Sequence, residues 1–398
     1  MASHRRLLGF VVFLALCGSP VHAQGESADE RYGFVVGLCD EKEWELAVRE
    51  ARSFLAEFPG HAKAALARYR LATALFELGQ REPAREEYAQ LARVPSFEFA
   101  TEVTFRLGQC ELALAHPDLA LKCFESVRAV EGHYLAAAAE YFCAEALFAT
   151  GDSAGAEQRY LRVLADPRAA EYEREARYGS AWCAYRRGHF DEACARVDEF
   201  TRRFSGDALS AELLHLKGEA HLAAKRPREA LAAFAQVREG TFVERALRGA
   251  AFATVELGDH GAAASAFGAM AARFPTGEFA AEARLQQGVE WLRAGDAARA
   301  LEVLRACAAT DIEAQCWLTR AQMSAQDALG ALATVDAALA LELKEEQAER
   351  LNVLRGDALT ALGRSVDAVL AYSRAKSDYA LYAAALAAYN DGRAQDAA

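Results

Sequence analysis

An alanine recurs along the 398-residue chain at intervals of 29 to 37 residues. A glycine stands five residues before many of these alanines, as Gly79, Gly151 and Gly188 do. A period in this range is typical of stacked helical hairpins, in which each repeat contacts only its neighbours in the array. The pattern therefore predicts an extended repeat array rather than a compact enzyme domain. The period alanines are Ala47, Ala84, Ala120, Ala156, Ala193, Ala230, Ala263, Ala300, Ala331, Ala368 and Ala397.

Residues 64–96 show one period in detail. Apolar side chains follow a helical spacing over 65–78, and Gly79 fits the left-handed residue that ends a helix. Pro83 fits the first turn of a second helix, and Pro95 stops that helix. Each period is therefore predicted as a helix–turn–helix hairpin, whose two members we call the A helix and the B helix.

Two further positions keep step with the period alanines. A small residue lies twelve positions before them, as in Ala72, Gly108, Ala144, Ala181, Gly218, Ala251, Gly288, Gly356 and Ala385. A large ring lies four positions after them, as in Tyr88, Phe124, Tyr160, Phe234, Phe267 and Tyr372. With closing prolines at Pro59 and Pro275, this pattern resembles the tetratricopeptide repeat. The resemblance implies that the small residues let the two helices approach while the ring fills the gap to the next repeat.

The resemblance covers roughly residues 30–398 and implies an all-α fold. We expect an α-solenoid of about ten to eleven stacked repeats that forms a right-handed superhelix. The last repeat is expected to be incomplete, because the chain ends at Ala398 inside its second helix. The pattern departs from the family in two repeats. Lys42 and Val35 replace the small residues of the first repeat, and Gln326 and Thr319 replace those of the ninth.

The N-terminus resembles an export signal. Arg5 and Arg6 precede ten apolar residues, 7–16, which are too few to span a bilayer. Small residues around position 22 predict cleavage after Ala23, so that residues 1–23 are a signal peptide and 24–29 a short N-terminal segment. A lipoprotein anchor at Cys17 is the alternative, although Leu16 before it is larger than such a signal prefers. No later segment is apolar enough to cross a membrane.

The repeats look most similar to the variant found in bacterial envelope proteins. These include periplasmic partners of the Tol–Pal system and outer-membrane assembly lipoproteins. We therefore expect a periplasmic or secreted protein.

Composition and motifs argue against several function classes. The net charge of −12 disfavours binding to nucleic acid. The sequence has no phosphate-binding loop, no dinucleotide fingerprint and no His-Glu-x-x-His helix. His215 and His221 are close in sequence, but a six-residue step puts them on different faces of a helix. We therefore predict neither a catalytic site nor a metal ion or cofactor.

Six cysteines form short pairs that flank predicted turns. An oxidising compartment would allow each pair to form a disulfide across two antiparallel helices. The alternative is that the thiols are small buried side chains, since the spacing between helices often exceeds the roughly 7 Å that a bridge tolerates. The candidate pairs are Cys110 with Cys123, Cys183 with Cys194, and Cys307 with Cys316.

The position fifteen residues before the period alanines is aromatic in the first five repeats. It lies on the flank of the A helix, together with the positions four and seven residues later. In proteins that this chain resembles, that flank lines the concave groove, where rings would anchor an extended peptide or an apolar helix. The commoner fate of periodic rings is to pack against the next repeat. The candidate partner-binding residues are Tyr32, Tyr69, Phe105, Tyr141, Tyr178, Trp182, Tyr185 and His215.

The sequence leaves three functions open. The first is a non-catalytic scaffold of the cell envelope that binds a protein or peptide partner in the groove. The second is the docking or regulatory arm of a larger envelope protein or enzyme, which the end at Ala398 truncates. The third is a module that stacks glycans or peptidoglycan on its rings. Because later repeats lose the aromatic position, any such site is expected in the first five or six repeats.

Overall fold

The computed structural model describes residues 27–308 and 311–390, so the predicted signal peptide lies outside the described residues. The described part is all-helical, with 21 α-helices and one 3₁₀-helix and no strand. The α-helices are α1 Ala28–Asp40, α2 Trp44–Glu57, α3 Ala64–Glu77, α4 Arg81–Leu91, α5 Ala100–Ala113, α6 Pro117–Arg128, α7 Ala136–Thr150, α8 Ser153–Ala165, α9 Glu173–Arg186, α10 Phe190–Arg203, α11 Ser210–Ala223, α12 Pro227–Phe234, α13 Val243–Glu256, α14 His260–Arg273, α15 Ala280–Arg293, α16 Ala297–Cys307, α17 Ile312–Ser324, α18 Ala328–Leu339, α19 Glu345–Ala361, α20 Ser365–Tyr372 and α21 Asp378–Asn390.

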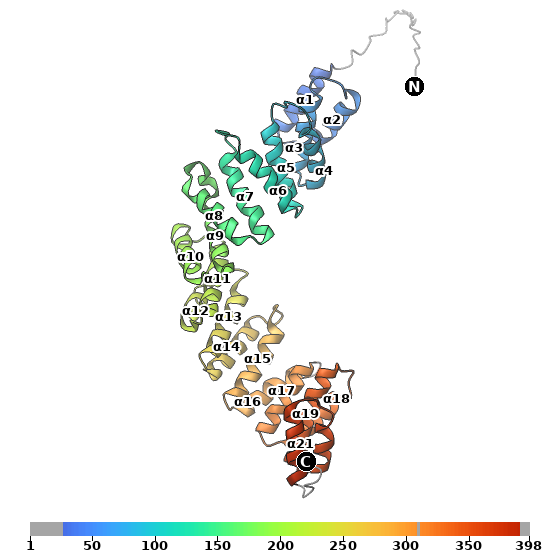
Figure 1. Cartoon of the computed structure of the whole chain (residues 1–398), viewed down its shortest axis with the longest axis vertical. Helices are drawn as coiled ribbons and strands as arrows, with labels where there is room; N and C mark the ends of the chain where they lie inside the picture. Colours follow the sequence, from blue (N-terminus) through green and yellow to red (C-terminus); the bar gives the residue numbers. More distant parts are fainter. Residues whose placement is uncertain (1–26, 309–310, 391–398) are drawn as a thin grey trace, which may run out of the picture. The chain divides into compact units, whose positions relative to one another are not determined.

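The chain divides into two compact units, residues 1–146 and 147–398, which are described separately. Within each unit, helices adjacent in sequence pack against one another, as Figure 1 shows for α1–α6 and for α8–α21. Odd-numbered helices are the A helices of the predicted hairpins and even-numbered helices are the B helices. Some A helices also contact the next A helix, as α11 does α13 and α17 does α19. The fold is therefore an α-solenoid of stacked helical hairpins, as the sequence predicts.

Every turn between the A and B helices of the ten hairpins contains a left-handed residue five positions before the period alanine. Glycine occupies six of these positions, and its lack of a Cβ makes the conformation inexpensive. Lys42 and Gln326 adopt the same conformation, with φ of 62° at both, although neither is a glycine. The repeat register therefore holds in the first and ninth repeats, where the sequence departs from the family pattern. The ten residues are Lys42, Gly79, Ala115, Gly151, Gly188, Lys225, Gly258, Gly295, Gln326 and Gly363.

The period alanines from Ala47 to Ala368 are all fully buried. The small positions twelve residues earlier are also buried from Val35 to Gly356. At Gly218 of α11, a Cβ would overlap the ring of Phe234 from α12, and at Gly249 of α13 a Cβ would overlap the same ring. The ring of the B helix thus fills the space between its own A helix and the next one, which confirms the packing that the resemblance implies.

We expect Gly218→Ala to destabilise the chain by about 1–3 kcal/mol, because the new methyl group overpacks against Phe234. The matched control is Gly33→Ala in α1, where nothing lies within 4 Å of the added Cβ. There the helix propensity of alanine should stabilise the chain by roughly 0.5–1 kcal/mol. Urea denaturation followed by circular dichroism measures both changes. Equal effects of the two substitutions would contradict the packing described.

Candidate binding site

Four of the aromatic-position residues belong to the first unit, where their rings contact other rings. Tyr69 of α3 stacks on Phe99 at a centroid distance of 5.1 Å. Phe105 of α5 is 6% exposed and lies 5.3 Å from Phe142 of α7. Tyr32 and Tyr141 are also half-buried and lie within 6.1 Å and 5.1 Å of a neighbouring phenylalanine ring. Tyr69 and Phe105 therefore contribute to the packing between repeats.

The other four belong to the second unit. On α9, Trp182 lies 6.5 Å from the ring of Tyr178 and 6.0 Å from that of Tyr185. The hydroxyl of Tyr178 donates a 2.7 Å hydrogen bond to Glu212 of α11. The buried indole N–H of Trp182 has no hydrogen-bond partner in the described structure. His215 of α11 contacts Phe234 and Phe242 at 5.6 and 5.8 Å.

The eight residues therefore form two groups, one in each unit, and none of them is fully exposed. Phe105 is buried, whereas the half-buried rings of the others keep an outer edge for contact while their faces pack on neighbours. Whether a partner binds along them stays a prediction.

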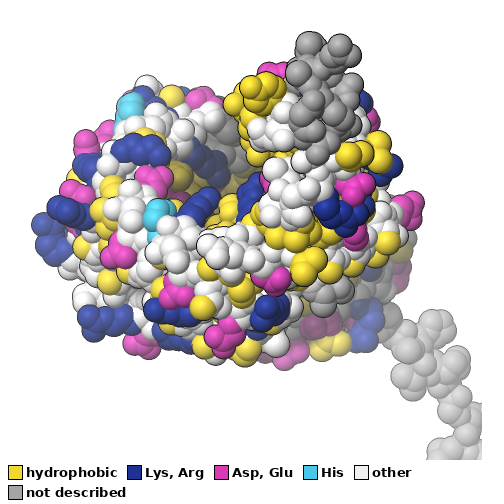
Figure 2. Space-filling model, turned by 90° about the horizontal axis from the view of Figure 1, so that it is seen from below, with side chains coloured by type: hydrophobic (Ala, Val, Ile, Leu, Met, Phe, Trp, Pro, Cys, Tyr) yellow, Lys and Arg dark blue, Asp and Glu magenta, His cyan; other side chains and the backbone are white. Residues whose placement is uncertain are grey.

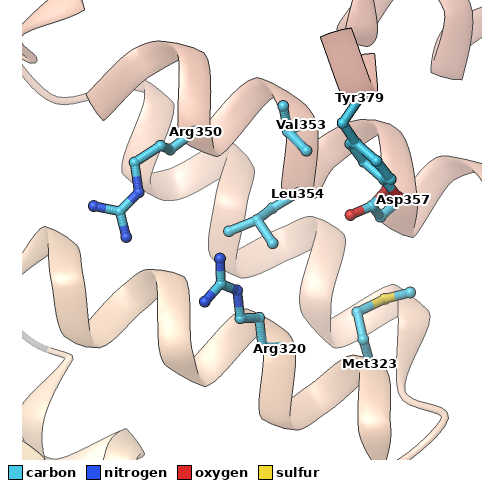
Figure 3. A pocket seen from close by; sticks show the side chains of 7 residues that line it. All are labelled: Arg320, Met323, Arg350, Val353, Leu354, Asp357 and Tyr379. Carbon is cyan, nitrogen blue, oxygen red and sulfur yellow. The ribbon is translucent and has the colours of Figure 1, made fainter. Parts of the chain in front are cut away.

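A groove that the sequence analysis missed lies on the same helix flank in the last repeats. It has a volume of about 460 Å³ and is formed by α17, α19 and α21, as Figure 3 shows. A second hollow of about 380 Å³ continues from it, and the two share Asp357 and Tyr379. The first is lined by Arg320, Met323, Arg350, Val353, Leu354, Asp357 and Tyr379. The second is lined by Asp357, Thr360, Ala361, Tyr372, Tyr379, Tyr382, Ala383, Leu386, Ala387 and Asn390.

The lining residues follow the register of the aromatic position. Val353 and Tyr382 occupy that position itself, and Arg320, Asp357 and Leu386 lie four residues after it on their own helices. The sequence predicts no site here, because Cys316 and Val353 break the series of rings. The tyrosines of α21 were the signal that could have located the groove. The expectation that a site lies in the first five or six repeats stays a prediction, and the last repeats add this groove on the same flank.

The two sides of the groove differ in charge. On one side, Arg350 pairs with Glu313 at 2.8 Å, and the guanidinium of Arg320 lies 4.6 Å from the ring centre of Trp317. On the other side, an oxygen of Asp357 accepts hydrogen bonds from the hydroxyls of Tyr372 and Tyr379, at 2.7 and 3.0 Å. Burial, together with this carboxylate, raises the pKa of both tyrosines.

The cysteines considered for disulfides are largely buried. Cys110, Cys123, Cys194, Cys307 and Cys316 are free thiols in the structure. Burial raises the pKa of Cys110 and of Cys123 to about 11, which slows their oxidation because the thiolate is the reactive form. Cys183 is buried as well.

Within residues 27–308 and 311–390, no group of three or more His, Cys, Asp or Glu side chains is arranged to hold a metal ion. No helix in that part of the chain has the length and apolarity needed to cross a membrane. Positive and negative side chains are interspersed over the face shown in Figure 2.

An array of helical hairpins with a small residue in most A helices defines a class of repeat scaffolds. Models of the tetratricopeptide repeat match residues 66–95, 105–177 and 178–242. These segments are tetratricopeptide repeats, and proteins built from them generally mediate protein–protein interaction. No enzyme family is indicated. A search of curated proteins finds no match.

Several solved structures are similar to the chain. A tetratricopeptide repeat protein from Parabacteroides merdae is 14% identical, with a TM-score of 0.43, over 75% of this chain and 100% of that one. The C-terminal part of a repeat protein from Cytophaga hutchinsonii is 19% identical, with a TM-score of 0.46, over 71% and 99%. YrrB, described as having an unusual peptide-binding site, is 19% identical, with a TM-score of 0.39, over 47% and 91%. The resemblance to Tol–Pal and outer-membrane assembly proteins stays a prediction.

We expect Cys110 and Cys123 to react slowly with iodoacetamide in the folded protein, because their raised pKa keeps the thiolate scarce near neutral pH. Both should be alkylated fully once urea unfolds the chain without a reductant. Mass spectrometry of the labelled peptides reads each cysteine separately. Labelling of the folded protein in buffer without glutathione serves as the baseline. Protection that persists in urea and disappears only after reduction would instead establish a disulfide.

His215 should make the stability depend on pH. Burial, and then the charges of Arg245 and Arg248 on α13, lower the pKa of His215 to about 4. Its own helix contributes Glu219, whose carboxylate lies 3.7 Å from the ring. Between pH 6.5 and pH 4 the unfolded histidine binds a proton that the folded one does not, so stability falls as the pH falls.

The variant His215→Gln should therefore lose less stability than the wild type between pH 7 and pH 4.5. Because the site is only partly shielded from solvent, we expect a difference of about 1–2 kcal/mol. Urea denaturation at both pH values measures it. His189→Gln, at an exposed histidine, is the control and should behave like the wild type. An identical pH response of His215→Gln and the wild type would contradict the assignment.

Proposed function

We propose that this chain is an exported, non-catalytic scaffold of the cell envelope that binds a segment of a protein partner along the aromatic flank of its A helices. The observation that carries the proposal is the repeated use of this flank. Half-buried rings occupy it in both units, and in the last repeats it opens into an apolar groove. The location rests on the predicted signal peptide of residues 1–23.

The chemistry of the flank suits a protein segment. Tyrosine and tryptophan are enriched among residues that dominate binding energy, because they offer a large rigid surface with one polar atom. Trp182 fits this description through its large ring, which is half-buried on the flank beside the rings of Tyr178 and Tyr185. Tyr178 is held in place by its hydrogen bond to Glu212, so that its ring needs little ordering on binding.

A photo-crosslinking amino acid tests the proposal in intact cells. It replaces Phe76 of α3 or Tyr185 of α9, both of which are half-buried on the flank. The controls replace Leu119 of α6 and Leu161 of α8, which are 46% and 45% exposed on B helices. We expect light-dependent adducts with one abundant envelope protein from the flank positions, because the partner lies against the A helices.

Adducts that form equally from the B-helix positions would overturn the flank as the binding surface. Adducts with glycan strands instead of protein would overturn the partner class. Recovery of an uncleaved chain in the cytoplasmic fraction would overturn export.

A further inference from the structure

The groove of α17, α19 and α21 has a positive end and a negative end. Arg320 is exposed, and within the described ranges no carboxylate lies at ion-pair distance from its guanidinium. Its neighbour Arg350 forms an ion pair with Glu313. Figure 3 shows both guanidinium groups on one side of the groove and Asp357 with Tyr379 on the other.

Arg320 differs from those arginines of the A helices in the second unit that pair with acids of the next repeat. Arg248 pairs with Glu282 at 2.7 Å, and Arg174 with Asp207 at 3.0 Å. Arg320 is instead held against Trp317, which fixes its guanidinium beside the groove without neutralising it.

The floor and far wall of the groove are apolar. Leu354 lies between the two arginines and Asp357, and Met323 lies on the same side as Asp357, as Figure 3 shows. Beyond Asp357, the exposed side chains of Tyr382 and Leu386 line the second hollow, and they are 68% and 45% exposed. The volume of about 460 Å³ lies within the roughly 300–1,000 Å³ of clefts that enclose ligands.

We propose that this groove binds an amphipathic segment of the protein partner, with a carboxylate against Arg320 and apolar side chains along Leu354, Met323 and the α21 tyrosines. The inference rests on the proposed function and names the segment's chemistry and its place. Asp357 sets the direction, because its charge repels the segment's acid from that end. The net charge of −12 does not prevent binding, since salt screens charges beyond a Debye length of about 8 Å.

The probe is a randomised peptide library displayed on phage. Phage that bind the full mature chain are selected from it. We expect enriched peptides to combine one acidic residue with nearby apolar residues. An enriched peptide is then labelled with fluorescein, and its Kd is measured by fluorescence anisotropy. The same measurement is made on two variants of the peptide, in which the acidic residue is changed to glutamine or to lysine. Arg320→Glu should weaken binding of the acidic peptide roughly tenfold or more, because a charged hydrogen-bond partner is lost and a repulsion added.

The charge reversal gives the decisive readout. Arg320→Glu should bind the lysine peptide better than the acidic one, which a merely structural defect would not produce. The control is Arg228→Glu, at an exposed arginine of α12, and it should leave the Kd unchanged. Circular dichroism checks that both variants keep their helicity.

Three results would overturn the inference. They are enrichment without an acidic preference, an unchanged Kd in Arg320→Glu, and no enriched peptide at all. Peptides that bind Arg320→Glu normally but fail on Trp182→Ala would overturn the groove while leaving the proposed function intact. Failure of the crosslinking from Phe76 and Tyr185 would count against the proposed function by itself.

Discussion

The fold depends on one recurring contact, in which a ring of a B helix lies against an A helix at a position with almost no side chain. At Gly356 of α19, an added Cβ would overlap the ring of Tyr372 from α20. At Gly108 of α5, it would lie 2.8 Å from the ring of Phe124. Interiors of proteins are packed as densely as organic crystals, so such a contact fixes both the distance and the rotation of the two helices. The left-handed residue at each turn then sets where the B helix begins.

This fixed rotation determines what the remaining faces of the A helices can do. In each repeat the same three positions, fifteen, eleven and eight residues before the period alanine, emerge on one flank. Where these positions are aromatic, the rings pack between repeats, as Tyr69 does on Phe99. At one such position the side chain is charged and forms an ion pair between successive A helices, as Arg248 does with Glu282. In both cases the side chains of the flank stabilise the contact between repeats. A buried ring or a paired charge then no longer offers its full surface to a partner.

The repeat architecture could be predicted from the sequence because it rests on local, periodic signals. The period alanines, the turn residues and the small positions each recur in every hairpin, and the left-handed φ at Lys42 and Gln326 shows that the register survives without glycine. The rings were predicted as a series, but their exposure was not. Exposure depends on residues such as Phe99 and Phe142, which lie outside the periodic positions. The groove of the last repeats escaped prediction for the same reason, since it is lined by residues of three successive A helices whose types do not repeat.

The flank carries different side chains in the middle and in the last repeats. In α9, Trp182 fills the position that Arg320 occupies in α17 and Asp357 in α19. At the aromatic position itself, α9 carries Tyr178, whereas α17 and α19 carry Cys316 and Val353. The smaller side chains leave the volume between successive A helices unfilled, and the two charged ones lie along its edges (Figure 3). In the binding model that we propose, the loss of the aromatic series does not end the partner's path along the flank. The flank that packs between the earlier repeats has space and an exposed arginine, Arg320, in the later ones.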